Sequence, residues 1–182
     1  LEVNKAGSFS FRMLPNHPHY DTIQLRTSIL DVYQNGELIF EGVPVSIDTD
    51  FWKRKRVTCE GELTFLNDSI LRQLNPTHRT VTELLGDYLA EHNAQVDNWK
   101  QFQVGTVTVG TGLYLNRFTN YVTTLSQIAE DLVNDLGGFL RVRHDQGVRY
   151  LDYLDASPHT SKQVVHIGKN LTDLKTNLDT LD

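Results

Sequence analysis

Polar and apolar residues alternate along much of the first 65 positions, and a period of two is typical of half-buried strands. Ser28–Gln34 leads directly into Asn35-Gly36 and a second apolar run, which predicts a β-hairpin with a primed turn. Residues 1–75 are therefore predicted to form a β-rich barrel or sandwich that lacks its first strands. The expected strands are Ser8–Met13, Ser28–Gln34, Leu38–Phe40, Glu41–Asp50 and Arg56–Phe65.

The pattern changes to a helical period after Asn75-Pro76. Thr80 and Glu83 have the spacing of a capping box, and the apolar positions behind them fall on one helix face. Thr124 and Gln127 predict a second capping box, which opens a helix that ends at Gly137-Gly138. The first helix is expected to bury Val81, Leu84, Leu85, Tyr88, Leu89 and His92, and the second Leu125, Ile128, Ala129, Leu132, Val133 and Leu136.

Three more strands are predicted beside these helices. One covers Phe102–Val109, and a hairpin joins Phe139–His144 to Val148–Leu154 through the three-residue loop Asp145-Gln146-Gly147. Residues 76–155 are therefore predicted to be an α+β module. Residues 156–182 are predicted to hold a returning strand at Gln163–Ile167 and a C-terminal segment. The fold class is α+β.

Composition excludes several classes of protein. The chain has 182 residues, of which 39% are hydrophobic and 22% charged. These proportions are those of a globular protein with a sizeable core. The net charge of −6 argues against a protein that mainly binds nucleic acid. No apolar run approaches the length of a transmembrane helix, which is roughly 20 residues. Cys59 is the single cysteine, so no intrachain disulfide can form, and we expect its thiol to be a small buried hydrophobe.

The sequence holds no recognisable catalytic or cofactor motif. It lacks a nucleophile elbow and a phosphate-binding glycine loop, and Ser69 has no neighbours in sequence that would activate it. The acidic pairs Glu130-Asp131 and Asp152/Asp155 are read as solvated faces. We therefore predict no catalytic residue, no cofactor and no cofactor-binding residue.

The seven histidines do not form a metal-binding pattern either. His17 and His19 are the only close pair, and we interpret their segment as a polar surface turn. His92 lies on the apolar side of its helix, where a hydrogen-bonded interior histidine is expected. No metal ligand is predicted. The remaining histidines, His78, His144, His159 and His166, have no evident partners in the sequence.

A basic run, Lys53–Arg56, follows Phe51-Trp52 between two predicted strands. Four cations on a short connection are most often a solubilising loop or an edge guard. Aromatic groups next to cationic ones can also suit nucleic acid or a lipid surface. A docking contact with an acidic protein partner is a third interpretation. The sequence leaves these interpretations open.

Several segments resemble the tail hub proteins of long-tailed phages and prophages of Gram-positive bacteria, also named tail-associated lysins or prophage endopeptidase tail proteins. The similar segments follow one another in order across nearly the whole chain. They are Gly7–Phe11, Pro15–Asp21, Val32–Gly42, Val57–Ser69, Leu136–Arg143, Gly147–Leu154 and Gly168–Leu174.

The resemblance implies a structural protein of the virion, located at the phage tail tip and encoded by a prophage in its bacterial host. Such proteins form a homotrimeric baseplate hub at the distal end of the tail tube. The implied partners are the distal tail protein, the tail tube and the tape measure protein. The resemblance implies an N-terminal platform that is not an enzyme, with any peptidase or lysin activity in a further C-terminal region.

Two other functions stay open. One is a receptor- or carbohydrate-binding module, for which Trp52, Trp99 and Tyr114 are candidate sugar platforms. The other is a cell-wall hydrolase or endopeptidase.

Overall fold

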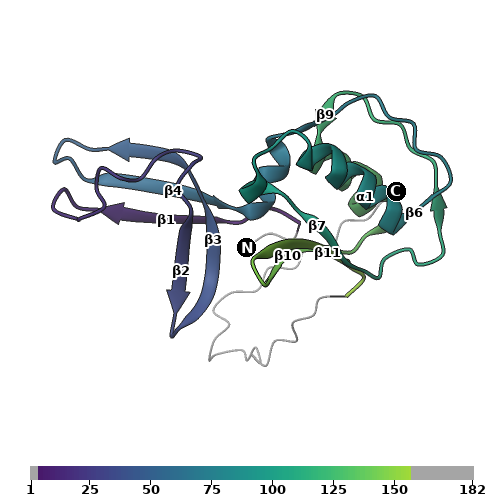
Figure 1. Cartoon of the computed structure of the whole chain (residues 1–182). Coiled ribbons are helices and arrows are strands. Elements are labelled where there is room, and N and C mark those ends of the chain that lie inside the picture. The colour runs from purple at the N-terminus through teal and green to yellow at the C-terminus, as the bar shows by residue number, and fades with distance from the viewer. Residues whose placement is uncertain (1–3, 157–182) are drawn as a thin grey trace, which may run out of the picture.

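The computed structural model describes residues 4–156, which form a strand-rich α+β fold (Figure 1). An antiparallel four-stranded sheet in the order β1-β4-β3-β2 curls into half of a barrel. The α+β class and the β-rich first part are confirmed, whereas the predicted boundary near residue 75 stays a prediction. The strands of this sheet are β1 (Ser8–Met13), β2 (Leu30–Gln34), β3 (Glu37–Thr49) and β4 (Lys55–Gly61).

The prediction of two strands after the hairpin turn is wrong, because β3 is one continuous strand of 13 residues. Its first part pairs with β2, and from Gly42 onward it pairs with β4. A Cβ at Gly42 would collide with the Glu60 carbonyl oxygen, so glycine lets the strands approach where β3 changes partner. The predicted primed turn is confirmed, since Asn35 and Gly36 have φ values of 53° and 84°, and a turn of this type needs a positive φ at both positions.

The predicted strand Arg56–Phe65 is also wrong in its second half. Strand β4 ends at Gly61, and a 3-10 helix, η1 (Glu62–Asn67), follows it. Four successive side chains of η1 are buried, from Leu63 to Leu66, whereas a half-buried strand would leave every other one exposed. Burial against the helices of the second part therefore determines that this segment is helical and not extended.

The first predicted helix is confirmed as α1 (Val81–Asn93). Thr80 accepts a hydrogen bond from the Glu83 amide, and the Glu83 carboxylate accepts one from the Thr80 amide, which completes the capping box. The six positions that were expected on the apolar face are the buried residues of α1.

The second helix is confirmed, but its capping residue is Thr123 and not Thr124. The Thr124 hydroxyl lies inside, 2.7 Å from the Ser69 hydroxyl, and the Gln127 amide donates to Asp131 and not back to the helix start. The helix is α2 (Thr124–Ile128), and it continues as the π-helix η3 (Ala129–Asn134) before the predicted end at Gly137-Gly138.

A second sheet has the order β10-β11-β7 and lies beside α1 (Figure 1). The hairpin is confirmed, but its loop has two residues, because Asp145 pairs with Val148 and only Gln146 and Gly147 lie between them. Its strands are β7 (Gln103–Val107), β10 (Phe139–Asp145) and β11 (Val148–Leu154). The short elements are β5 (Ile70–Leu71), β6 (Arg79–Thr80), η2 (Asn98–Lys100), β8 (Tyr114–Leu115) and β9 (Val122–Thr123).

One hydrophobic core joins η1, both helices and the second sheet, and Val43 of β3 extends it into the first sheet. Cys59 is fully buried, as expected, and burial raises the pKa of its thiol. Among residues 4–156, no helix is long and apolar enough to cross a membrane. The predicted strand Gln163–Ile167 and the C-terminal segment lie outside the described residues.

Candidate functional site

Four charged or titratable side chains meet where the first sheet contacts the β10–β11 hairpin. We call Glu41, Glu62, His144 and Arg149 the junction cluster. The His144 ring lies between the two carboxylates: its Nε2 is 2.9 Å from a Glu62 oxygen and its Nδ1 is 3.3 Å from a Glu41 oxygen. These side chains come from β3, η1, β10 and β11, so the cluster ties the two sheets together.

Arg149 is the most enclosed member, with 9% of its side chain exposed. Its Nε donates to Glu62, its Nη1 donates to the Trp99 carbonyl at 2.6 Å, and Nη2 lies 3.6 Å from Glu41. The guanidinium also lies 5.0 Å from the Phe65 ring centroid, a cation–π contact. Arg149 is therefore held by charge, by a backbone carbonyl and by an aromatic ring at once.

The cluster shifts the titration of Glu41. Burial raises the pKa of the Glu41 carboxyl, and the neighbouring Glu62 and Asp31 carboxylates raise it further, while His144 and Arg149 oppose the shift. The ionised form of Glu41 is therefore disfavoured in the folded protein relative to an exposed glutamate.

A cavity of about 510 Å³ opens beside the junction cluster. Trp99 and Phe102 form its apolar wall, and the amide side chains of Asn98 and Gln103 line it together with three cluster members. Its volume is in the range of small-molecule pockets, which is about 300–1,000 Å³.

The cluster also offers ligand atoms for a metal ion. One atom from each of Glu41, Glu62 and His144 lies within 4.8 Å of the others. However, the Arg149 guanidinium contacts both carboxylates and supplies the positive charge that a bound cation would supply. The arrangement is therefore better described as a salt-bridge cluster that joins the sheets.

Replacing Glu41 by Gln is expected to stabilise the protein at neutral pH. The folded-state pKa of Glu41 is raised above the ordinary value of 4.5. Its contribution to stability is therefore complete below that value and is lost as pH rises through the raised pKa. Gln is uncharged at every pH, so the variant avoids this loss. We expect the midpoint of urea unfolding to rise at neutral pH and to match the wild type below pH 4.5.

The control is Glu37→Gln at the exposed start of the same strand, which is expected to leave the midpoint unchanged. A Glu41→Gln protein that is less stable at neutral pH would contradict the prediction and would show that attraction to Arg149 and His144 dominates.

The structure also places the histidines that the sequence singled out. His17 and His19 lie on an exposed loop with ring centroids 5.7 Å apart. His92 is fully buried and hydrogen-bonded, as predicted: Ser69 Oγ is 2.7 Å from its Nδ1, and the Lys100 carbonyl is 3.1 Å from its Nε2. Ser69 is 2% exposed, so this serine–histidine pair is part of the core.

The acidic pairs are not the solvated faces that we expected. Asp152 is 1% exposed and accepts hydrogen bonds from a backbone amide and two arginines, and Asp131 accepts from Tyr88 and Gln127. Only Asp155 and Glu130 match the prediction of accessible carboxylates. Asp131 and Asp152 hold neighbouring elements together.

The three candidate sugar platforms lie on separate elements. Trp52 is in the loop between β3 and β4, Trp99 is in η2, and Tyr114 is in β8, where it stacks on His78 with centroids 4.2 Å apart. Of these, Trp99 alone lines the cavity beside the junction cluster.

Sequence reasoning missed the junction cluster because no local pattern marks it. His144 and Glu62 are 82 positions apart, and each looks like an ordinary polar residue within its own predicted strand. The one usable signal is that successive side chains of β10 point to opposite faces of the sheet. His144 therefore lies on the same face as Leu140 and Val142.

A scan against protein-family models finds no match for this sequence, and no curated protein is significantly similar to it. The resemblance to tail hub proteins therefore rests on the sequence motifs.

Proposed function

We propose that this chain is a structural component of a phage tail tip, the platform of a baseplate hub, and that it assembles as a homotrimer at the distal end of the tail tube. In this proposal it works through surfaces that bind further copies and other tail proteins, and it carries further domains. The proposal comes from the resemblance of the sequence motifs, and one structural feature supports it.

That feature is the ribbon formed by β2 and the first part of β3. Strand β2 is an edge strand, and residues 37–41 pair with β2 only, so both edges of the ribbon are open within the described residues. The ribbon bends away from β1 and β4 (Figure 1). Two-stranded ribbons are marginally stable in water, and open edges invite pairing with another chain.

The ribbon also exposes three large apolar side chains. Tyr33, Leu38 and Ile39 are 61%, 45% and 56% exposed. Grouped exposed apolar side chains mark interaction sites in soluble proteins. A ring of identical copies would cover these side chains and the open edges together, which favours self-assembly.

Native mass spectrometry over a concentration series tests the proposal. We expect a species of three times the 20.8 kDa chain mass. In the double variant Leu38→Lys/Ile39→Lys, the concentration needed for the trimer is expected to rise by roughly tenfold or more for each side chain, because charge replaces buried apolar area.

The matched control is Leu113→Lys, which changes a similarly exposed leucine in another part of the fold and is expected to leave the trimer intact. Far-ultraviolet circular dichroism checks that each variant is folded. A wild-type chain that stays monomeric at every concentration would contradict the proposal.

A further inference from the structure

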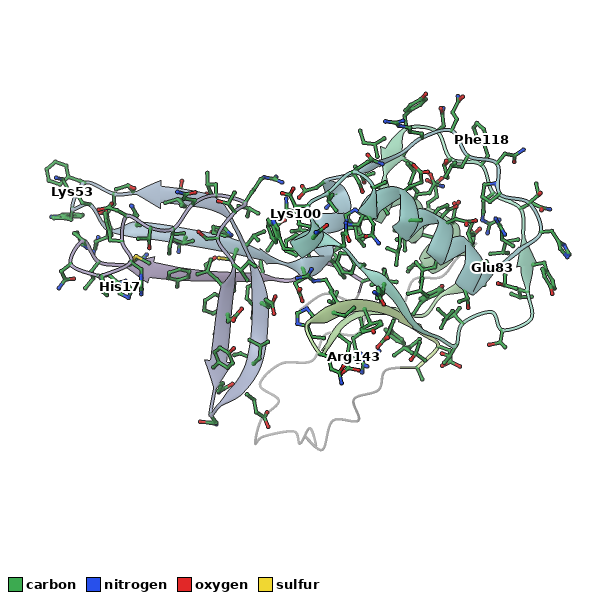
Figure 2. The ribbon with its side chains drawn as sticks, in the orientation of Figure 1. His17, Lys53, Glu83, Lys100, Phe118 and Arg143 are labelled. Atoms are coloured by element: carbon green, nitrogen blue, oxygen red, sulfur yellow. The ribbon has the colours of Figure 1, made fainter. Side chains whose placement is uncertain are left out.

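The loop between β3 and β4 presents two adjacent aromatic side chains to solvent. We call Phe51, Trp52, Lys53 and Arg54 the aromatic tip. Phe51 is 91% exposed and Trp52 is 68% exposed, and their rings pack edge to face with centroids 5.7 Å apart. The tip lies at the far end of the first sheet, away from the helices and the second sheet (Figure 2, Lys53). The Arg54 guanidinium lies 5.0 Å from the Trp52 ring centroid, and both rings remain mostly exposed.

Hydrogen bonds hold the tip in one shape. The Lys53 amide donates to the Asp50 carbonyl at 2.9 Å, and the Asp50 amide donates to the Arg54 carbonyl at 3.0 Å. The Asp50 carboxylate accepts from the Arg54 amide and side chain at 2.8 and 2.7 Å. The Tyr20 hydroxyl, from the neighbouring loop, donates to the Lys53 carbonyl. A loop that is already ordered loses little conformational entropy when it binds.

Cations lie directly behind the aromatic rings. Arg12 and Arg56 are cross-strand partners on β1 and β4, both are exposed, and neither forms an ion pair within residues 4–156. Like charges that face each other across a strand pair are unfavourable. Asp48 faces Arg56 from β3 and offsets part of this repulsion, and an external anion beside Arg12 would offset the rest. The two arginines line a hollow of about 250 Å³ together with Arg54, although Asp48 and Asp50 also line it.

We propose that the aromatic tip binds the surface of an anionic lipid bilayer. Phe51 and Trp52 enter the boundary between headgroups and acyl chains, where aromatic residues are favoured. Arg56 is the second residue of β4, so it lies roughly 7 Å behind Arg54, the last residue of the loop. Arg12 and Arg56 then lie at the level of the lipid phosphates.

The shape of the tip favours a bilayer over a protein partner. The apolar surface consists of two rings on a narrow convex loop, with Lys53 and Arg54 beside them. Arg12 and Arg56 are set back along the strands. A bilayer requires only that the aromatic rings lie deeper than Arg12 and Arg56, whereas a protein partner would need a pocket that is complementary to the loop. The inference uses residues outside the β2–β3 ribbon, so it does not depend on the proposed trimer.

Trp52 itself can report the binding. The sequence contains two tryptophans, so Trp99→Phe leaves Trp52 as the only one. Vesicles of phosphatidylcholine mixed with phosphatidylglycerol are compared with vesicles of phosphatidylcholine alone. With the anionic vesicles we expect Trp52 emission to shift to shorter wavelength and to become protected from an aqueous quencher. The shift should weaken at high salt, which screens the arginines.

Two variants, each made in the Trp99→Phe protein, separate the contribution of the cations to vesicle binding from that of the aromatic rings. Arg12→Gln/Arg56→Gln is expected to lower the partition coefficient for anionic vesicles by about fivefold for each cation removed. Phe51→Ala is expected to lower it for both kinds of vesicle. The control is Phe118→Ala, which removes another exposed aromatic from the opposite end of the molecule (Figure 2) and should change nothing.

Co-sedimentation of the otherwise unchanged chain with the same vesicles, with and without Trp52→Ala, covers the case in which Trp99→Phe does not fold. Trp52 emission that stays at its water-exposed wavelength with a folded protein overturns the proposal and assigns the tip to a protein contact. Sedimentation that Trp52→Ala leaves unchanged overturns it as well.

Discussion

Replacing Asp152 by Ala is expected to lower the free energy of unfolding by about 3 kcal/mol, the lower end of the range for a broken buried ion pair. The Asp152 carboxylate accepts hydrogen bonds from the Thr106 amide at 2.9 Å, from Arg141 at 2.8 Å and from Arg143 at 3.3 Å. Its loss would leave two arginines and a backbone amide without their acceptor. The arginines are about one third exposed, so water can recover part of the loss.

Urea unfolding followed by circular dichroism measures this effect. Asp152→Asn, which keeps an acceptor but removes the charge, is expected to cost less than Asp152→Ala. The matched control is Asp155→Ala near the end of the same hairpin, whose side chain has one hydrogen-bond partner within residues 4–156, the Thr108 hydroxyl. For this control we expect a loss of no more than about 1 kcal/mol. Equal losses for Asp152→Ala and Asp155→Ala would contradict our account.

Asp152 also predicts how the protein responds to acid. Burial raises the pKa of its carboxyl, but the hydrogen bonds from Thr106, Arg141 and Arg143 outweigh burial and hold that pKa below the ordinary value of 3.8. A lowered folded-state pKa contributes stability that is present above 3.8 and is lost as pH falls through the folded value. In Asp152→Asn this part of the acid sensitivity should be absent.

Replacing His92 by Ala is expected to cost about 2–4 kcal/mol, from an internal cavity and from hydrogen bonds left without partners. His92 accepts from the Ser69 hydroxyl and donates to the Lys100 carbonyl, and Ser69 in turn lies 2.7 Å from the Thr124 hydroxyl. This chain of hydrogen bonds connects α1 to α2 and to η2. Thermal or urea unfolding of the variant checks the loss.

The same histidine makes stability depend on pH. Burial lowers the pKa of His92 in the folded protein, so the unfolded chain binds a proton first as pH falls below the ordinary value of 6.5. Stability is therefore complete above pH 6.5 and is lost as pH falls toward the folded pKa. We expect His92→Asn to remove this part of the slope.

The matched control for this slope is His17→Gln on an exposed loop, which is expected to leave the pH dependence of the wild type unchanged. If His92→Asn kept the wild-type slope and His17→Gln lost it, the buried imidazole would not be the group responsible.

The two helix starts show how far local sequence carries a prediction. At Thr80 the capping box forms as predicted, because both of its hydrogen bonds join residues three positions apart. At Thr124 the same spacing is present. However, the Thr124 hydroxyl is hydrogen-bonded to the Ser69 hydroxyl, and the Gln127 side-chain amide donates to Asp131. The cap therefore moves to Thr123, since two buried polar partners outweigh a surface capping bond.

The sequence by itself determined the elements whose contacts lie within a few residues. The Asn35-Gly36 turn, the buried face of α1 and the β10–β11 hairpin were all predictable because propensity and periodicity act locally. Only the tertiary structure decided that the four residues Leu63–Leu66 are buried in η1, that β3 is one strand with two partners, and that His144 meets Glu62 from 82 positions away. Those outcomes depend on which surfaces pack together and which charges lose water, and no run of neighbouring residues records either.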